Sequence, residues 1–206
     1  MTQLAQSWHT AWSALTHNDS GDALFTALLV AYSAPQRHYH TLQHLQECVE
    51  HFEATAHLAR HPHEVAIALW FHDAIYDTHA HNNEAASAQW AVQALRAAHA
   101  PSDTCARVEA LIMATRHSAA PTTPDACLLV DIDLSILGAD EARFTQYEAQ
   151  IKCEYSFVDA AIFNVKRAEI LRGFMARAKI YSTPLFNQKL EAKARENLAR
   201  SIQLLG

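Results

Sequence analysis

An apolar run that ends in a polar pair constrains this chain more than any other stretch of its sequence. Seven consecutive apolar residues, Val65 to Phe71, lead directly into His72 and Asp73, and a second apolar segment, Ala74 to Tyr76, follows. A buried ionised group without a partner destabilises the folded state strongly. The pair therefore needs a cation, a hydrogen-bond network or a metal ion. From this stretch alone, a metal site and a buried His-Asp hydrogen bond that holds a turn are equally supported.

Length and composition favour one domain with a full core. The chain has 206 residues, half of them hydrophobic at 50%, and its composition does not change along the sequence in a way that separates two domains. We therefore predict a single compact domain over residues 1–206.

Charge and cysteine usage exclude several classes of function. The formal net charge is -6, and Lys and Arg are scattered, so no basic stripe for nucleic acid is present. No apolar run approaches the ~20 residues that span a bilayer, and the N-terminus lacks a signal pattern. The four cysteines form no CxxC, which indicates reduced, packed thiols rather than a disulfide frame or a thiolate zinc site. We expect a cytoplasmic protein that binds neither nucleic acid nor membrane.

Apolar residues recur every three to four positions through most of the chain, which is the period of an amphipathic helix. Prolines and capping residues divide this pattern into helices. We expect the first helix to end near His17, the second to end at Pro35 and the third to contain Leu45 to Phe52. The fourth should run from Pro62 through His72, the fifth from a cap at Asn82 or Asn83 to before Pro101, and the sixth should begin at a Ser102 cap. Three later helices should begin at an Asp140 cap, run from roughly Val158 to Tyr181, and begin after Pro184.

The segment from Leu128 to Gly138 is ambiguous. Its apolar residues alternate with Asp131, Asp133 and Ser135, which is the period of a strand. The rest of the chain offers no second strand to pair with it. We therefore predict a short buried helix here and an all-α fold.

Two further groups of polar residues have the chemistry of metal ligands. His40 and His44 are four residues apart and share a face of the third helix if that helix begins early enough, so that either can meet His72 and Asp73. Asp131 and Asp133 lie in the most apolar stretch of the second half, where carboxylates rarely lack a partner. A salt bridge to an arginine is the competing explanation for these two carboxylates.

Together these residues form an ordered set of motifs that resembles a known family. The set consists of Arg37, Tyr39, His40 and His44; Trp70 to Tyr76; Asn83, Glu84, Ser87 and Ala88; Thr115 to His117; and Asp131, Asp133, Leu134, Leu137 and Gly138. It resembles the HD superfamily of metal-dependent phosphohydrolases, which is all-helical, and within it a group of small, stand-alone bacterial proteins described as predicted metal-dependent HD phosphohydrolases. The resemblance covers most of the chain. Lys152 stands where that group tends to have Arg, which keeps a basic contact but removes bidentate geometry.

The resemblance implies a metal site and roles for the residues around it. The implied metal ligands are His44, His72, Asp73 and Asp133. Asp131 would either support these ligands without binding the metal itself or share the role of Asp133. The implied catalytic residues are Glu84 and His117, and the residues implied to contact substrate are Arg37, His40, Lys152 and Arg167. Imidazole and carboxylate ligands suit Mn, Fe, Co, Ni or Zn, and Mg is also compatible. The metal-site core would cover about residues 37–140, with helices in residues 140–204 packed on it.

The activity implied is hydrolysis of a small phosphorylated metabolite or nucleotide by metal-activated water. Two alternatives remain open: a di-iron oxygenase, in which His117 with His79 or His81 supplies extra ligands, and a non-catalytic nucleotide-binding regulator. Glu84 also fits a helix N-terminal carboxylate that interacts with the helix dipole. A homo-oligomer is compatible with the sequence.

Overall fold

The described part of the chain is all-helical, as predicted. The computed structural model describes residues 2–16 and 20–206, so the predicted end of the first helix at His17 lies outside the described residues. Within those residues the helices are α1 (Gln3–Leu15), α2 (Asp22–Tyr32), α3 (Leu42–Thr55), η1 (Ala56–Leu58), α4 (Pro62–Phe71), α5 (Asn83–Ala97), α6 (Ser102–Ala114), α7 (Pro124–Asp133), η2 (Leu134–Gly138), α8 (Glu141–Glu154), α9 (Ala160–Met175) and α10 (Pro184–Leu205).

The chain divides into two compact units. The first spans Met1–Ile132 and the second Asp133–Gly206, so the boundary falls at the last residue of α7. The single domain expected from length and composition stays a prediction, and each unit is described by itself below.

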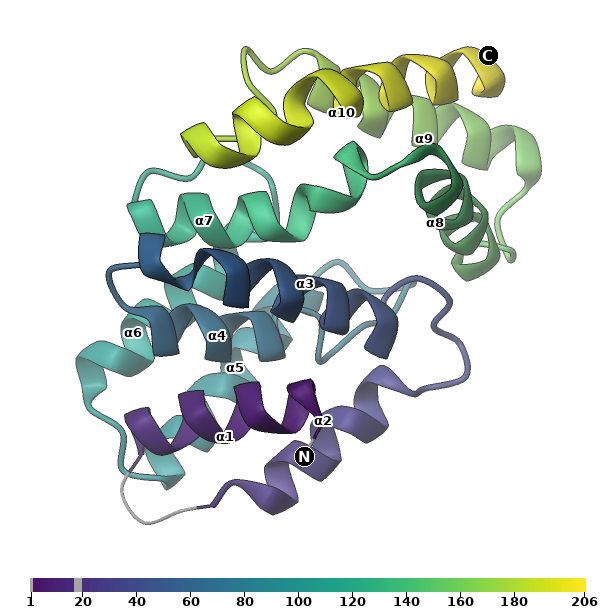
Figure 1. Cartoon of the computed structure of the whole chain (residues 1–206). Coiled ribbons are helices and arrows are strands. Elements are labelled where there is room, and N and C mark those ends of the chain that lie inside the picture. Colours follow the sequence, from purple (N-terminus) through teal and green to yellow (C-terminus); the bar gives the residue numbers. More distant parts are fainter. Residues whose placement is uncertain (1, 17–19) are drawn as a thin grey trace. The chain divides into compact units, whose positions relative to one another are not determined.

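Helix α4 is the centre of the first unit. It packs against α1, α3, α5 and α6, and Figure 1 shows α3 and α1 on either side of it. The helix begins at Pro62, as predicted, because a proline at the first position loses no intrahelical hydrogen bond. Every residue from Glu64 to Phe71 is buried. A helix that is covered on all sides needs no polar face, which explains the uninterrupted apolar run.

Aromatic side chains fix α1 and α2 to α4. Trp8 and Trp12 of α1 stack with their ring centroids 5.0 Å apart, and Trp8 meets Trp70 of α4 edge-on at 5.4 Å. The hydroxyl of Tyr32 at the end of α2 donates to the carbonyl of Trp70 at 3.2 Å. Before α2, Gly21 has a φ of 68°, and a Cβ there would lie 2.6 Å from Trp12. Glycine is therefore required at this turn by both its backbone and its neighbour.

The ambiguous segment is helical, as predicted. It forms the second half of α7 and the 3-10 helix η2, and its residues from Leu128 to Ile132 are buried. Because both sets of alternating residues are buried apart from the half-buried Asp133, the two-residue period does not mark an exposed and a buried face of a strand.

The second unit is built on α10, which packs against η2 and α9. The side-chain amide of Asn197 on α10 donates to the carbonyls of Leu137 and Ala139 at 2.9 Å each. The hydroxyl of Tyr181 donates to the carbonyl of Leu134 at 2.9 Å. The bonds from Asn197 satisfy carbonyls at the end of η2 that no helix continues to cover, and the bond from Tyr181 reaches the carbonyl of its first residue.

Helix α9 is shorter than predicted. It ends at Met175, whereas periodicity suggested a helix as far as Tyr181. The backbone N–H groups of Ile180 and Tyr181 instead donate to the carboxylate of Glu191 on α10, over 3.0 to 3.2 Å. A side chain distant in sequence thus replaces the helical acceptors.

Capping residues were predicted with mixed success. Asp140 caps α8 as predicted, because its side chain accepts from the N–H of Arg143 at 2.9 Å. Asn82 precedes α5 but makes no side-chain capping bond, and Ser102 is the first residue of α6 rather than its cap.

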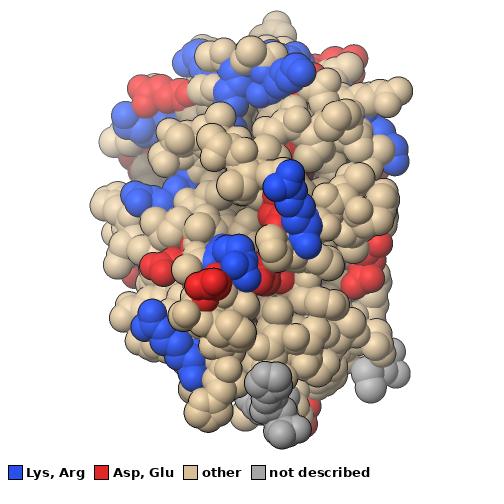
Figure 2. Space-filling view, turned by 90° about the vertical axis from the view of Figure 1, so that its left-hand side faces the viewer, with Lys and Arg blue, Asp and Glu red and all other residues tan. Residues whose placement is uncertain are grey.

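Charged side chains of both signs lie close together on the surface that Figure 2 draws, with uncharged residues around them. None of the helices in the described residues is long and apolar enough to cross a membrane.

Candidate metal centre

The C-terminal end of α4 presents His72 and Asp73. α4 ends at Phe71, and His72 follows with helical backbone angles. The Nδ1 of His72 lies 2.8 Å from the carbonyl oxygen of Leu69, to which it donates. This bond orients the ring and leaves Nε2 as the atom available to a ligand, an arrangement typical of metal-binding histidines.

His44 approaches this pair from α3. The helix begins at Leu42 after a Thr41 cap, so His44 lies in its first turn and is buried. Its Nε2 lies 3.1 Å from Nε2 of His72 and 3.5 Å from Oδ2 of Asp73. The same Asp73 oxygen is 3.0 Å from Nε2 of His72. Two imidazole nitrogens and a carboxylate oxygen therefore converge on one point, and the role of these three residues as metal ligands stays a prediction.

The electrostatics of this point favour a cation. Burial raises the pKa of Asp73, but the neighbouring imidazoles of His72, His40 and His44 outweigh it and hold the pKa well below its usual range. The carboxylate is thus ionised at neutral pH. Because Nδ1 of His72 donates to Leu69, its Nε2 faces the carboxylate oxygen of Asp73 and Nε2 of His44, and these atoms need a proton or a metal ion between them. Imidazole nitrogens and carboxylate oxygens are metal-ligand atoms, so this group could hold a metal ion.

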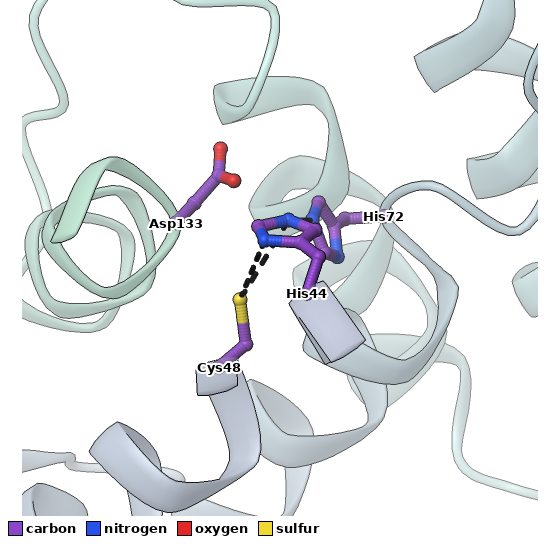
Figure 3. Close-up of side chains that lie close together, drawn as sticks. All are labelled: His44, Cys48, His72 and Asp133. Carbon is purple, nitrogen blue, oxygen red and sulfur yellow. Dashed lines mark hydrogen bonds between the residues drawn. The ribbon is translucent and has the colours of Figure 1, made fainter. Parts of the chain in front are cut away.

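Cys48 is a member of this cluster that sequence reasoning missed. Its Sγ lies 3.8 Å from Nδ1 and 3.7 Å from Nε2 of His44, one turn earlier on α3 (Figure 3). The ligand atoms of His44, Cys48 and His72 all lie within 4.8 Å of one another. The signal was available, because a Cys four residues after a His on one helix shares its face. The expectation of cysteines that serve only as packed thiols overlooked this spacing.

Arg37 holds the backbone that carries Asp73. Its Nη1 donates to the carbonyls of His40 at 3.0 Å and Asp73 at 2.6 Å, and its Nη2 donates to the carbonyl of Ala74 at 2.8 Å. The guanidinium lies 5.1 Å from the ring centroid of Tyr32. Because the planar group bridges three carbonyls, Arg37 fixes the turn after α4, and its predicted contact with substrate stays a prediction.

A second set of bonds fixes the chain that follows Asp73. The N–H of Ile75 donates to the hydroxyl of Ser87 at 3.0 Å, and this hydroxyl donates back to the carbonyl of Ile75 at 3.3 Å. Two residues further on, the N–H of Asp77 donates to Oδ1 of Asn83 at 3.1 Å. Side chains in the first half of α5 thus hold the backbone that follows Asp73 in place. This gives Asn83 and Ser87, two residues of the motif set, a structural role.

His40 does not share a helical face with His44, because α3 begins two residues after it. Its ring instead stacks on Tyr76, with the centroids 4.1 Å apart, and lies 6.0 Å from the ring of His44. The early helix start on which the shared face depended is therefore wrong. A contact between His40 and substrate stays a prediction.

The two predicted catalytic residues lie on different elements of the first unit. Glu84 is half-buried in the first turn of α5, where the helix dipole favours a carboxylate. His117 follows α6 and is half-buried, with a φ of 54°. Positive φ is uncommon for a residue with a Cβ and is enriched at functional sites. Their catalytic roles stay predictions.

The remaining predicted residues lie on α7 and in the second unit. Asp131 of α7 is fully buried, and Asp133 is the last residue of the same helix. Lys152 is exposed on α8. Arg167 of α9 is buried, pairs with Glu148, and lies 5.0 Å from the ring centroid of Tyr147. The ion pair that the sequence left open for Arg167 is present, and the roles of Lys152 and Arg167 toward substrate stay predictions.

No protein family, characterised protein or solved structure matches this chain in searches against all three.

Proposed function

We propose that this protein is a metal-dependent phosphohydrolase of the HD type that acts on a small phosphorylated metabolite or nucleotide. The observation that carries the proposal is the convergence of His44 Nε2, His72 Nε2 and Asp73 Oδ2, with distances of 3.0 to 3.5 Å among them. The order of these residues in the chain is also that of the HD motifs. Asp133 is the proposed carboxylate that completes the set, because it matches the position of the fourth ligand in the HD motifs.

The proposed chemistry is attack by water on a phosphate. His44, His72 and the carboxylates would hold a divalent ion, which would supply Lewis acidity and lower the pKa of a bound water. Asp73 stays ionised beside it, and Arg37 keeps Asp73 in place through the backbone. Glu84 and His117 are proposed to handle protons on the substrate side. Mn, Fe, Co, Ni and Zn fit the donor set, and the thiol of Cys48 adds a soft ligand that favours Co or Zn over Mg.

The decisive experiment compares Asp73→Ala with Glu50→Ala, a matched change of an exposed carboxylate on α3. Elemental analysis of the wild type should give one ion per chain. Asp73→Ala should lower metal affinity by more than about 100-fold, because loss of residues that merely support ligands already costs about 10–100-fold. Glu50→Ala should keep the ion, and circular dichroism should show both variants helical.

Activity is tested by a phosphatase screen of nucleotides and sugar phosphates, with Mn, Co and Mg supplied in turn. Wild type and Glu50→Ala should hydrolyse the same substrate, and Asp73→Ala should not. Full activity in folded Asp73→Ala would contradict the proposal. Two ions per chain, one of them lost in His117→Ala, would favour the di-iron alternative instead.

A further inference from the structure

A second candidate site lies at the opposite end of α4 from the metal centre. A pocket of about 450 Å³ is lined by the start of α4, the second half of α6, the start of α7 and the loop before it. Pockets of ~300–1,000 Å³ are typical of small-molecule sites. Glu64 in this pocket and His72 are eight residues apart on α4, which corresponds to about 12 Å of helical rise. The pocket and the metal centre are therefore distinct.

One wall of the pocket is apolar and made of small side chains. Leu111 and Met113 of α6 provide the larger apolar groups. The remaining apolar residues of the lining are Ala110, Ala114, Ala119, Ala120, Pro121, Pro124 and Ala126. Because alanines leave the space between these segments unfilled, the volume is available to an apolar body.

The two acidic residues of the pocket are already hydrogen-bonded within the protein. The carboxylate of Glu64, 4% exposed, accepts from Nε and Nη2 of Arg107 at 2.7 Å each. The carboxylate of Asp125, 7% exposed, accepts from the N–H of Arg60 at 2.7 Å, and from the N–H and Nδ1 of His61 at 3.1 and 2.9 Å. The acceptor positions of both carboxylates are thus occupied by groups of the protein, and Glu64 is in addition paired with an arginine.

Apart from the hydroxyls of Ser118, Thr122 and Thr123, which can donate or accept, the polar side-chain groups that remain at the pocket are donors. Within the described residues, the guanidinium of Arg60, Nη1 of Arg107 and Nε2 of His61 have no hydrogen-bond partner or ion pair. The pocket also includes the first turns of α4 and α7, where helix dipoles favour negative charge. An anionic head group meets donors here, while its apolar part meets the alanine-lined wall.

We propose that this pocket binds a small amphipathic anion, a carboxylate carried on a compact aromatic or hydrocarbon body. Arg60 is the principal charge that recognises the carboxylate, since Arg107 is held by Glu64. Binding does not depend on the metal centre or on the proposed hydrolase activity.

The test uses 2-naphthoate as the probe and 2-naphthalenemethanol as its uncharged counterpart, both measured by calorimetric titration of the full chain. Wild type should bind one 2-naphthoate. The alcohol should bind at least about tenfold more weakly, because charge-assisted hydrogen bonds are lost. Inorganic phosphate should bind more weakly than 2-naphthoate. Equal binding of acid and alcohol, or tighter binding of phosphate, would overturn the proposal.

Variants localise the binding. Arg60→Ala removes the unpaired cation, and Ala114→Leu fills the apolar space; each should weaken 2-naphthoate binding at least about tenfold. Arg96→Ala, an exposed change on α5 outside the pocket, is the matched control and should bind like wild type. Thermal melts establish that each variant folds, with Ala110→Leu as the second filling variant if Ala114→Leu does not. Unchanged affinity in folded Arg60→Ala and the folded filling variant would refute the site.

One further variant separates this proposal from the hydrolase. Asp73→Ala should bind 2-naphthoate with the wild-type affinity, whether or not the wild type proves to be a hydrolase. Loss of 2-naphthoate binding in folded Asp73→Ala would show that the probe occupies the metal centre and would overturn the assignment to this pocket.

Discussion

At the scale of single residues, Cys48 changes the chemistry expected of the metal centre. Its Sγ lies 3.7 Å from Nε2 of His44, in a fully buried position. Hard ions such as Mg and Mn prefer oxygen ligands, whereas thiolate selects softer ions. A site with Cys48 as a ligand is therefore biased toward Zn or Co.

We predict that protein loaded with Co²⁺ shows a thiolate-to-cobalt charge-transfer band in the near ultraviolet, and that Cys48→Ser lacks it. The serine variant should also bind Zn²⁺ about tenfold or more weakly, since it replaces a soft ligand by a hard hydroxyl. Absorption spectra and a competition titration measure the two effects. Cys153→Ser, which changes an exposed cysteine, is the control. A wild-type spectrum without the band would mean that Cys48 is only a packed thiol.

Residue patterns identified part of the candidate site and missed the rest for physical reasons. His72 and Asp73 could be found because two polar residues interrupt an apolar run, and His44 because its motif resembles that of HD proteins. Cys48 was missed although its spacing of four residues from His44 was visible in the sequence, because buried free cysteines are common in cores without any ligand role. The bonds from Arg37 to backbone carbonyls were also beyond prediction, since a sequence does not show which carbonyls lack partners.

At the scale of elements, the carboxylate of Glu191 on α10 organises the turn between α9 and α10. It accepts from two backbone N–H groups of that turn and from Nε of Arg195 at 2.8 Å. Burial raises the pKa of Glu191, but the two N–H donors and Arg195 outweigh it, so the pKa lies below its ordinary value of 4.5. The ionised form is thus favoured in the folded state.

This shift predicts a pH dependence of stability. A folded-state pKa below the unfolded value contributes stability above the unfolded pKa, and the contribution disappears as the pH falls through the folded pKa. We expect Glu191→Gln to lower the free energy of unfolding by about 1–2 kcal/mol at pH 7, and by progressively less below pH 4.5. Urea denaturation of both proteins at several pH values measures this. A cost that does not depend on pH would show that the charge of Glu191 contributes nothing.

Helix existence was predictable, whereas some helix ends were not. The recurrence of apolar residues every three to four positions predicted that α4 and α10 exist. The proline in the first turn of each predicted where they begin. At the end of α9, the carbonyl of Met175 accepts from Nη1 of Arg195 at 3.1 Å, and Arg195 lies 20 residues further along the chain. A local pattern contains no information on such a distant donor.

At the scale of the whole molecule, the histidines determine how the net charge responds to pH. The chain carries -6 at pH 7 with its 14 histidines neutral, and its isoelectric point is near 6.1. Histidine protonates over this same interval, so the net charge changes sign within a narrow range of pH. We predict a solubility minimum near pH 6.1, measured by precipitation with polyethylene glycol between pH 5 and 8. Solubility that stays constant through this interval would contradict the prediction.

The burial of α4 on all sides also affects the order in which the chain can fold during synthesis. Two of its neighbours, α1 and α3, precede it in the sequence, and the other two, α5 and α6, follow it. Until residue 114 has left the ribosome, the nascent chain holds an apolar helix with part of its surface uncovered. Nascent chains whose synthesis has reached a point between α4 and the end of α6 therefore expose the apolar segment from Val65 to Phe71. We expect chaperones that bind apolar stretches to bind this segment during that interval.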